Sequence, residues 1–299
     1  YGKEALLCYS YDATQIEHLP DLVIRPASAD QISKILKIAN RERIPVVPRG
    51  AGSGFSGGSI PVRGGIVLSL ERMNRILEFD EDDLIAVVEP GLVLGELHKL
   101  VESKGLFYPP DPSSSDFCTI GGNVAENASG PRSVKYGGTR NYVLGLEAIL
   151  PDGRVFNTGA RTVKSVAGYD LTRLMVGSEG TLGVVTKIIL RLLPLPEDIS
   201  TMMVYFPGID DAARAVSRII SSRLIPRALE FMDSESVKVI RESKKVPFPQ
   251  GVDSILIIEM DGESDNVKRD SRRVLDLCAG CNAIGSQMAA GDEERRMIW

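Results

Sequence analysis

The chain has 299 residues, 43% of them hydrophobic, and a formal net charge of -5. This length suits two domains with sizeable cores. The 40 acidic residues outnumber the 35 basic ones, so composition does not supply the basic surface that binds nucleic acid. No apolar run reaches the roughly 20 residues that cross a bilayer, and no signal peptide is visible at the start of the chain. A soluble, globular, cytoplasmic protein is therefore expected.

The cysteines point to a reducing compartment, because four in so long a chain fall far short of a disulfide framework. Cys278 and Cys281 form a CxxC pair, which could be half a zinc site or a redox pair. No second pair or nearby histidine completes such a site. We interpret them as ordinary thiols at the end of a helix.

The first 80 residues indicate a strand, a helix and two further strands. An apolar strand at 22–24 precedes Ser28 and Gln31, whose spacing is typical of a helix N-cap, and apolar residues then recur on one helical face. Strands are predicted at 44–47 and 66–70. Between these two strands lies a glycine-rich loop.

Residues 84–193 predict an antiparallel sheet, because short strands alternate with turns around one helix at 94–104. Asp152 and Gly153 lie between two strands and indicate a hairpin with a type I′ turn. The prolines in 194–196 end the last strand and mark a linker.

After the linker the pattern changes to an alternation of strands and helices in the order βαββαβ. A short extra helix is predicted at 234–242, and a surface loop at 244–249. The predicted elements of the main pattern are 201–206, 210–222, 228–232, 255–260, 266–277 and 283–286.

The glycine-rich loop at 48–59 suits an anion. Residues 52–57 match G-x-G-x-x-G after a strand, but a dinucleotide-binding loop of the Rossmann type must open a helix, and here the chain runs into another strand. The glycines still allow successive backbone N–H groups to converge on one pyrophosphate. An ordinary glycine loop is the alternative.

Two later stretches favour a large polar ligand. Residues 109–130 and 177–183 again combine glycines with small hydroxyl and amide side chains, which permit close approach. Three such clusters in one domain exceed what turns require.

Together these motifs closely resemble the FAD-binding vanillyl-alcohol oxidase superfamily, with the PCMH-type FAD domain. Within it, the chain is most similar to the branch of glycolate oxidase FAD subunits and D-lactate dehydrogenases. The matching segments run in family order along nearly the whole chain: 48–54, 109–114, 120–127, 135–137 and 177–183.

The resemblance implies an α+β fold with a two-subdomain FAD-binding domain at 1–196, divided at about residue 80. A ferredoxin-like βαββαβ cap domain would follow at 197–299. The cap is expected to be truncated at its C-terminal end, because the chain ends at Trp299, shortly before the place where the family carries an arginine that binds the substrate carboxylate.

Carried over position by position, the resemblance implies that FAD is bound, without a covalent bond, by twenty residues from three segments. These are Pro48, Arg49, Gly50, Ala51, Gly52, Ser53, Gly54, Ser56, Gly57, Pro112, Ser113, Thr119, Gly122, Asn123, Ala125, Asn127, Gly130, Glu179, Gly183 and Val184.

No catalytic residue is assigned from the sequence. The family carries an H-x-G-D-G-N-x-H motif late in the chain, and this sequence has none; a divalent metal is therefore expected only in a missing C-terminal part. His18 and His98 have no metal-ligand neighbours at useful spacing, so we assign them structural or solvent-exposed roles. Arg295 and Arg296 read as the solvated face of a terminal helix.

The resemblance implies FAD-dependent oxidation of a 2-hydroxy acid of the glycolate or D-lactate type. Hydride would pass from the substrate α-carbon to flavin N5, and electrons would pass on to a protein or quinone-linked acceptor. An iron–sulfur subunit or an electron-transfer flavoprotein is the implied partner, which could hold the protein at the inner membrane face; a homodimer is also compatible.

Two other functions stay open on the same fold. One is a non-catalytic, FAD-carrying electron-transfer subunit of a glycolate oxidase-like complex. The other is a reductase of the cell-wall precursor type, which would require a nicotinamide cofactor. The substrate side chain and the electron acceptor are not readable from the residues.

Overall fold

The computed structural model describes residues 2–244 and 248–299, and its chain divides into two compact units. One unit holds the chain up to Gly130 and then Gly138–Leu195; the other holds Pro131–Gly137 and Pro196–Trp299. Part of the surface loop predicted at 244–249 lies outside the described residues. Within the described ranges, none of the helices has the length and apolar character needed to cross a bilayer.

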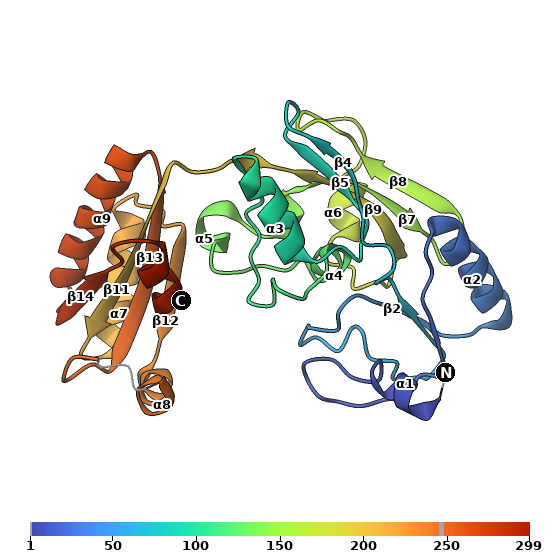
Figure 1. The fold of residues 1–299 in the computed structure, drawn as a ribbon, viewed down its shortest axis with the longest axis horizontal. Helices are drawn as coiled ribbons and strands as arrows, with labels where there is room; N and C mark the ends of the chain where they lie inside the picture. The colour runs from blue at the N-terminus through green and yellow to red at the C-terminus, as the bar shows by residue number, and fades with distance from the viewer. Residues whose placement is uncertain (1, 245–247) are drawn as a thin grey trace. The chain divides into compact units, whose positions relative to one another are not determined.

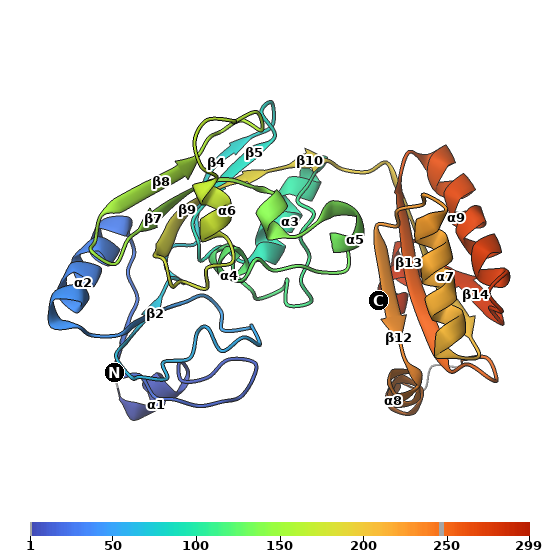
Figure 2. The ribbon, with the colours of Figure 1, turned by 180° about the vertical axis from the view of Figure 1, so that it is seen from behind.

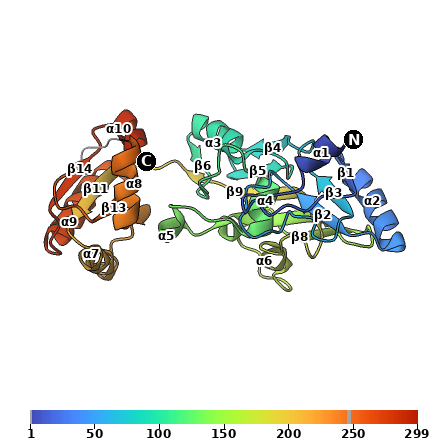
Figure 3. The ribbon, with the colours of Figure 1, turned by 90° about the horizontal axis from the view of Figure 1, so that it is seen from below.

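The first unit begins with a parallel sheet in the order β1-β3-β2; Figure 1 labels β2 and α2, and Figure 3 labels all three strands. Helix α2 (Ala29–Glu42) connects β1 to β2 and starts where predicted, because Ser28 Oγ accepts a hydrogen bond from Gln31 N at 3.3 Å. Gln31 Oε1 in turn accepts from Ala27 N at 2.8 Å. The three strands are β1 (Leu22–Ile24), β2 (Val46–Arg49) and β3 (Ile66–Ser69).

A five-stranded antiparallel sheet follows in the order β4-β5-β9-β7-β8, as the strand-and-turn pattern predicted. Its strands are β4 (Ile76–Asp80), β5 (Ile85–Val88), β7 (Val143–Ile149), β8 (Val155–Gly159) and β9 (Val184–Arg191). A two-stranded ladder joins β6 (Leu106–Phe107) to β10 (Leu193–Pro194).

The hairpin between β7 and β8 is present, but its predicted turn type is wrong. Gly153 N donates to Leu150 O at 2.8 Å, so the turn spans 150–153 with Pro151 and Asp152 at its centre. Only Gly153 of these residues has a positive φ, at 81°. A type I′ turn needs positive φ at both central positions, which the ring of Pro151 forbids.

Short helices lie between the strands along this part of the chain, and α2 packs against both sheets. Its buried Ile32 and Leu36 share a core with Leu68 of β3 and with Ile149 and Val184 of the antiparallel sheet. The remaining helices of this part of the chain are α1 (Lys3–Leu7), α3 (Leu94–Ser103), α4 (Ile120–Glu126), α5 (Ser133–Tyr136), the 3-10 helix η1 (Thr139–Asn141) and α6 (Leu171–Met175).

The second unit has the predicted βαββαβ order, in an antiparallel sheet arranged β12-β13-β11-β14. This is the ferredoxin-like arrangement, with α8 as the predicted extra helix, so the α+β fold is confirmed. Its elements are β11 (Asp198–Phe206), α7 (Ile209–Ser221), β12 (Ala228–Met232), α8 (Ser234–Lys244), β13 (Ser254–Gly262), α9 (Ser264–Ala279), β14 (Gly285–Met288) and α10 (Asp292–Ile298).

The two faces of this sheet are covered differently. Helices α7 and α9 cover one face, where alternate residues such as Met202 and Phe206 are fully buried (Figure 2). Helix α8 packs on the opposite face, where Val237 meets Tyr205 and Ile257 (Figure 3). Farther along that second face the sheet carries charged side chains instead.

Segment 131–137, which contains α5, packs with the second unit although the chain around it belongs to the first. The sequence did not predict this excursion. We retain 1–196 and 197–299, with the subdivision at about residue 80, as the proposed domains. The expected truncation of the cap also stays a prediction, although all four strands of the βαββαβ motif are present.

Candidate functional site

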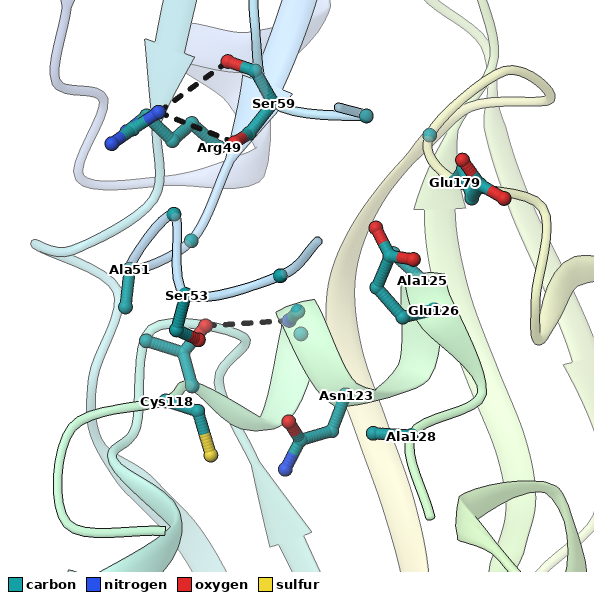
Figure 4. Close-up of a pocket in the computed structure, with 18 of the residues that line it drawn as sticks. Arg49, Ala51, Ser53, Ser59, Cys118, Asn123, Ala125, Glu126, Ala128 and Glu179 are labelled. Atoms are coloured by element: carbon teal, nitrogen blue, oxygen red, sulfur yellow. Dashed lines mark hydrogen bonds between the residues drawn. The ribbon is translucent and has the colours of Figure 1, made fainter. Parts of the chain in front are cut away.

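A cavity of about 400 Å³ lies in the first unit, where the three predicted clusters meet (Figure 4). The predicted residues that line it are Pro48, Arg49, Gly50, Ala51, Gly52, Ser53, Gly54, Ser56, Pro112, Ser113, Thr119, Gly122, Asn123, Ala125, Glu179 and Gly183. They come from the end of β2 and the loop after it, from α4 and the segment leading into it, and from the turn before β9.

Glycine is sterically required at two places in the loop after β2. A Cβ on Gly50 would lie 2.3 Å from Thr119 Oγ1, so the loop rests directly on the start of α4. Gly52 has φ +69°, and a Cβ there would lie 2.2 Å from Arg49 Nη2. The close approach of backbone leaves the loop's N–H groups free of obstructing side chains.

Arg49 links the two ends of this loop by hydrogen bonds to Ser59. Its Nη1 donates to Ser59 Oγ at 3.2 Å and to Ser59 O at 3.4 Å, and its guanidinium lies 5.9 Å from the Tyr9 ring centroid. Burial lowers its pKa from 12.5, although Asp12 and two nearby tyrosines oppose that shift. An arginine remains charged under these conditions, so the cavity has a cation at the base of the loop.

The wall formed by α4 offers an unused hydrogen-bond donor. Thr119 caps the helix by accepting from Gly122 N at 3.3 Å. One turn on, Asn123 is 4% exposed, and its Nδ2 has no hydrogen-bond partner among the described residues. A buried amide without a partner costs free energy, so a ligand that accepts from Asn123 would relieve that cost.

The carboxylates of Glu126 and Glu179 lie close together in the lining of the cavity (Figure 4). Glu126 accepts from Ser56 Oγ at 2.9 Å, and a Cβ on Gly58 would lie 3.1 Å from Glu126 and 3.3 Å from Glu179. Burial raises the pKa of Glu126, and the negative charges of Glu179 and Asp12 raise it further. This end of the cavity therefore suits hydroxyl groups better than phosphate oxygens.

Four predicted residues lie outside the lining. Gly57 N donates to Asp12 Oδ2 at 3.0 Å, and Asn127 Oδ1 accepts from Arg140 N at 2.9 Å. A Cβ on Gly130 would lie 2.1 Å from Asp111 O. Val184 faces the core beside α2. Their predicted contact with a cofactor stays a prediction.

The structure adds lining residues that the sequence analysis missed. Val185 replaces Val184 because successive strand residues point to opposite faces, and the phase of β9 was not visible in a run of apolar residues. Asp12 also lines the cavity, although it is distant in sequence from the three predicted clusters. Glu126 could have been found, since it lies inside a glycine-rich cluster already singled out. The other additions are Phe55, Gly58, Ser59, Leu70, Pro90, Ser114, Cys118, Gly121, Ala128, Ser129, Ser178 and Gly180.

Neither the histidines nor the CxxC pair is among the residues that line this cavity. His98 Nε2 lies 3.1 Å from Pro110 O, a contact within the fold, and His18 is exposed. Cys278 and Cys281 are buried in the core of the second unit, at the end of α9. In the part of the chain that the structure describes, no group of three or more His, Cys, Asp or Glu side chains could hold a metal ion.

Two family models match the chain. The model of an FAD binding domain matches residues 20–159, and the model of the C-terminal domain of FAD linked oxidases matches residues 195–299.

Curated relatives and solved structures agree with these models. Glycolate oxidase subunit GlcD of Bacillus subtilis is 48% identical over 96% of this chain and 62% of its own length. D-lactate dehydrogenase of Archaeoglobus fulgidus is 44% identical over 73% of this chain and 48% of its own length. The chain thus spans less than two thirds of these relatives. An alkyldihydroxyacetonephosphate synthase structure shares the fold, with a TM-score of 0.82 and 24% identity over 99% of this chain and 59% of that one.

Proposed function

Because the chain belongs to the family of FAD-linked oxidases, we propose that it takes part in FAD-dependent oxidation of a 2-hydroxy acid of the glycolate or D-lactate type. The substrate class rests on the names of the similar proteins. The observation that carries the proposal is the cavity, in which three glycine clusters from distant segments form one cradle.

The residues of the cavity fit FAD. Backbone N–H groups of the loop after β2, with the Arg49 charge at its base, suit the pyrophosphate, because the glycines let the loop pack against Thr119 and Arg49, where a Cβ at Gly50 or Gly52 would clash. Asn123 Nδ2 is a buried donor that has no hydrogen-bond partner within the described part of the chain. Glu126 and Glu179 are acceptors for hydroxyl groups. When bound, FAD supplies the two-electron acceptor for the reaction.

The chain's own residues contribute binding and orientation in this proposal. The Ser59 contact fixes the Arg49 guanidinium, so the loop needs little rearrangement when the cofactor enters. Pro90 packs against Gly121 and keeps the start of α4 against the adjoining strand. We assign no general base and no substrate-binding arginine to the described residues.

Electron transfer to a separate partner is part of the proposal. Several relatives bear the name of a glycolate oxidase subunit, which favours an assembly with another chain; an iron–sulfur subunit or an electron-transfer flavoprotein is the partner that we propose. The same names favour a second candidate function, an FAD-carrying subunit whose catalytic partner is another chain.

Anaerobic reduction of the bound flavin tests the proposal. The protein is mixed separately with glycolate, D-lactate, L-lactate or NADPH, and the absorbance of the flavin is followed. Bleaching by glycolate or D-lactate supports the first function. Bleaching only by NADPH would identify a reductase, and no bleaching by any of them alone, with bleaching after addition of a catalytic partner chain, would identify the carrier function.

A further inference from the structure

Residues 131–137, which we call the strap, leave the first unit and pack as part of the second. The residues that flank the strap, which we call its base, are joined to each other in the first unit. Thr139 donates two hydrogen bonds to Ala128 O, from N at 3.0 Å and from Oγ1 at 2.8 Å. The strap is therefore a short excursion whose base and tip are held by different units.

The tip of the strap is fixed to one buried carboxylate. Lys135 Nζ donates to Asp261 O at 3.0 Å and forms an ion pair with the Asp261 carboxylate. Tyr136 Oη donates to Asp261 Oδ2 at 2.7 Å. The Asp261 side chain is 0% exposed, and a carboxylate removed from water depends on such partners.

Asp261 is itself held in a network across the sheet of the second unit. Arg227 Nη1 lies 3.1 Å from Asp261 Oδ2, and Arg227 Nε lies 3.3 Å from Glu259 Oε2. Glu259 accepts from Thr201 Oγ1 at 2.6 Å and from Trp299 Nε1 at 2.7 Å. The strap thus docks on a carboxylate whose position is determined by β11, by β13 and by Arg227, which directly precedes β12.

The base of the strap continues into the wall of the cavity. Ala128 and Ser129 line the cavity, and the strap begins two residues after Ser129. On the other side of the base, Arg140 N donates to Asn127 Oδ1 at 2.9 Å. Movement of the strap would be transmitted along the chain to this wall.

We propose that Asp261 is a positioning residue for FAD, which acts through Lys135 and Tyr136 by holding the strap and with it the cavity wall at 128–130. A released strap must be ordered again when the cofactor binds. Only a fraction of the molecules then has the binding conformation, and the apparent dissociation constant rises in inverse proportion to that fraction. This inference concerns cofactor binding alone and is independent of which substrate is oxidised.

Titration of apoprotein with FAD, followed by flavin fluorescence, tests the inference. Lys135→Met leaves Asp261 paired with Arg227 and Tyr136, so the protein should fold, and FAD binding should weaken about tenfold, the equivalent of one charge-assisted hydrogen bond. Lys135→Arg should restore most of the affinity. Adding Lys135→Met to Asp261→Asn should weaken binding no further, because both changes remove one interaction.

Two control variants separate this effect from general damage. Lys238→Met removes an exposed lysine of the second unit, and Lys164→Met removes an exposed lysine of the first unit; both should keep the wild-type affinity. Cleavage by chymotrypsin after Tyr136 should be faster in Lys135→Met than in the wild type. Wild-type FAD affinity in Lys135→Met, or an equal loss in Lys238→Met, would overturn the inference.

Discussion

Gly52 shows how closely the loop after β2 is packed. Its φ of +69° lies in the left-handed region, and a Cβ would meet the Arg49 guanidinium, which Ser59 holds. We predict that Gly52→Ala gives protein with little bound flavin, because the side chain would displace Arg49 and distort the loop. Flavin absorbance of the purified protein measures the effect. Gly105→Ala is the matched control, since Gly105 has φ +70° with nothing within 4 Å of the added Cβ, so it should cost only about 1 kcal/mol of stability and stay yellow.

Ser53 bears on how the cofactor would be attached. The family resemblance implies a histidine at this place in relatives that tether flavin through the loop, and the hydroxyl of Ser53 offers no imidazole nitrogen for that bond. We predict that FAD is held without a covalent bond. Acid precipitation should leave the yellow colour in the supernatant; colour in the pellet would contradict the prediction.

The buried thiol of Cys278 should make the free energy of unfolding decrease as the pH rises above 9. Burial, and then the neighbouring Cys281, raise its pKa from 9.0 to about 12. The folded state keeps the thiol neutral while the unfolded state ionises at lower pH, so this stabilisation is complete below pH 9 and is lost between pH 9 and about 12. Urea unfolding of the wild type at rising pH should show a slope of at most about 1.4 kcal/mol per pH unit from this group. Cys278→Ala should reduce that slope, and Cys8→Ala should not.

Strand β9 separates the cavity from the core within two residues. Val184 packs with Ile32 and Leu36, whereas Val185 lines the cavity. We predict that Val184→Ala lowers the free energy of unfolding by about 2 kcal/mol, through lost burial and a residual void, with FAD affinity kept. Val185→Phe should instead weaken FAD binding and keep the free energy of unfolding, since its ring would intrude into the cavity. Urea unfolding and FAD titration of both variants measure this; the same response in both would refute the alternation.

Local elements were predictable where a periodic pattern or a cap defines them. Ser28 with Gln31 located the start of α2, and the alternation after Pro196 gave the ferredoxin-like order. Helix α4 was not predicted, because the glycines at 121 and 122 conceal its periodicity and its stability comes from contact with Pro90 and Gly50. The glycine clusters gave most of the cavity lining, but Asp12 reaches it only through the fold.

The two units should unfold as separate transitions, because each has its own core. We predict that FAD raises the midpoint of one transition, by mass action, with about 2.7 kcal/mol of stabilisation at 100 times the dissociation constant. Glu259→Gln should lower the free energy of unfolding of the second unit by about 3 kcal/mol, because it breaks a buried pair with Arg227. Scanning calorimetry with and without FAD measures both; a single transition that both changes shift equally would contradict the prediction.

The strap changes what counts as a separable part of this protein. The chain leaves the first unit after residue 130, returns to it at 138 and leaves it again after 195, so a cut at the linker alone separates the strap from the rest of the second unit. Exchange of the C-terminal domain between two members of the family would therefore have to carry seven residues of the N-terminal half along with it. A chimera that ignores them would face the buried Asp261 with a foreign side chain, and recombination during evolution meets the same constraint.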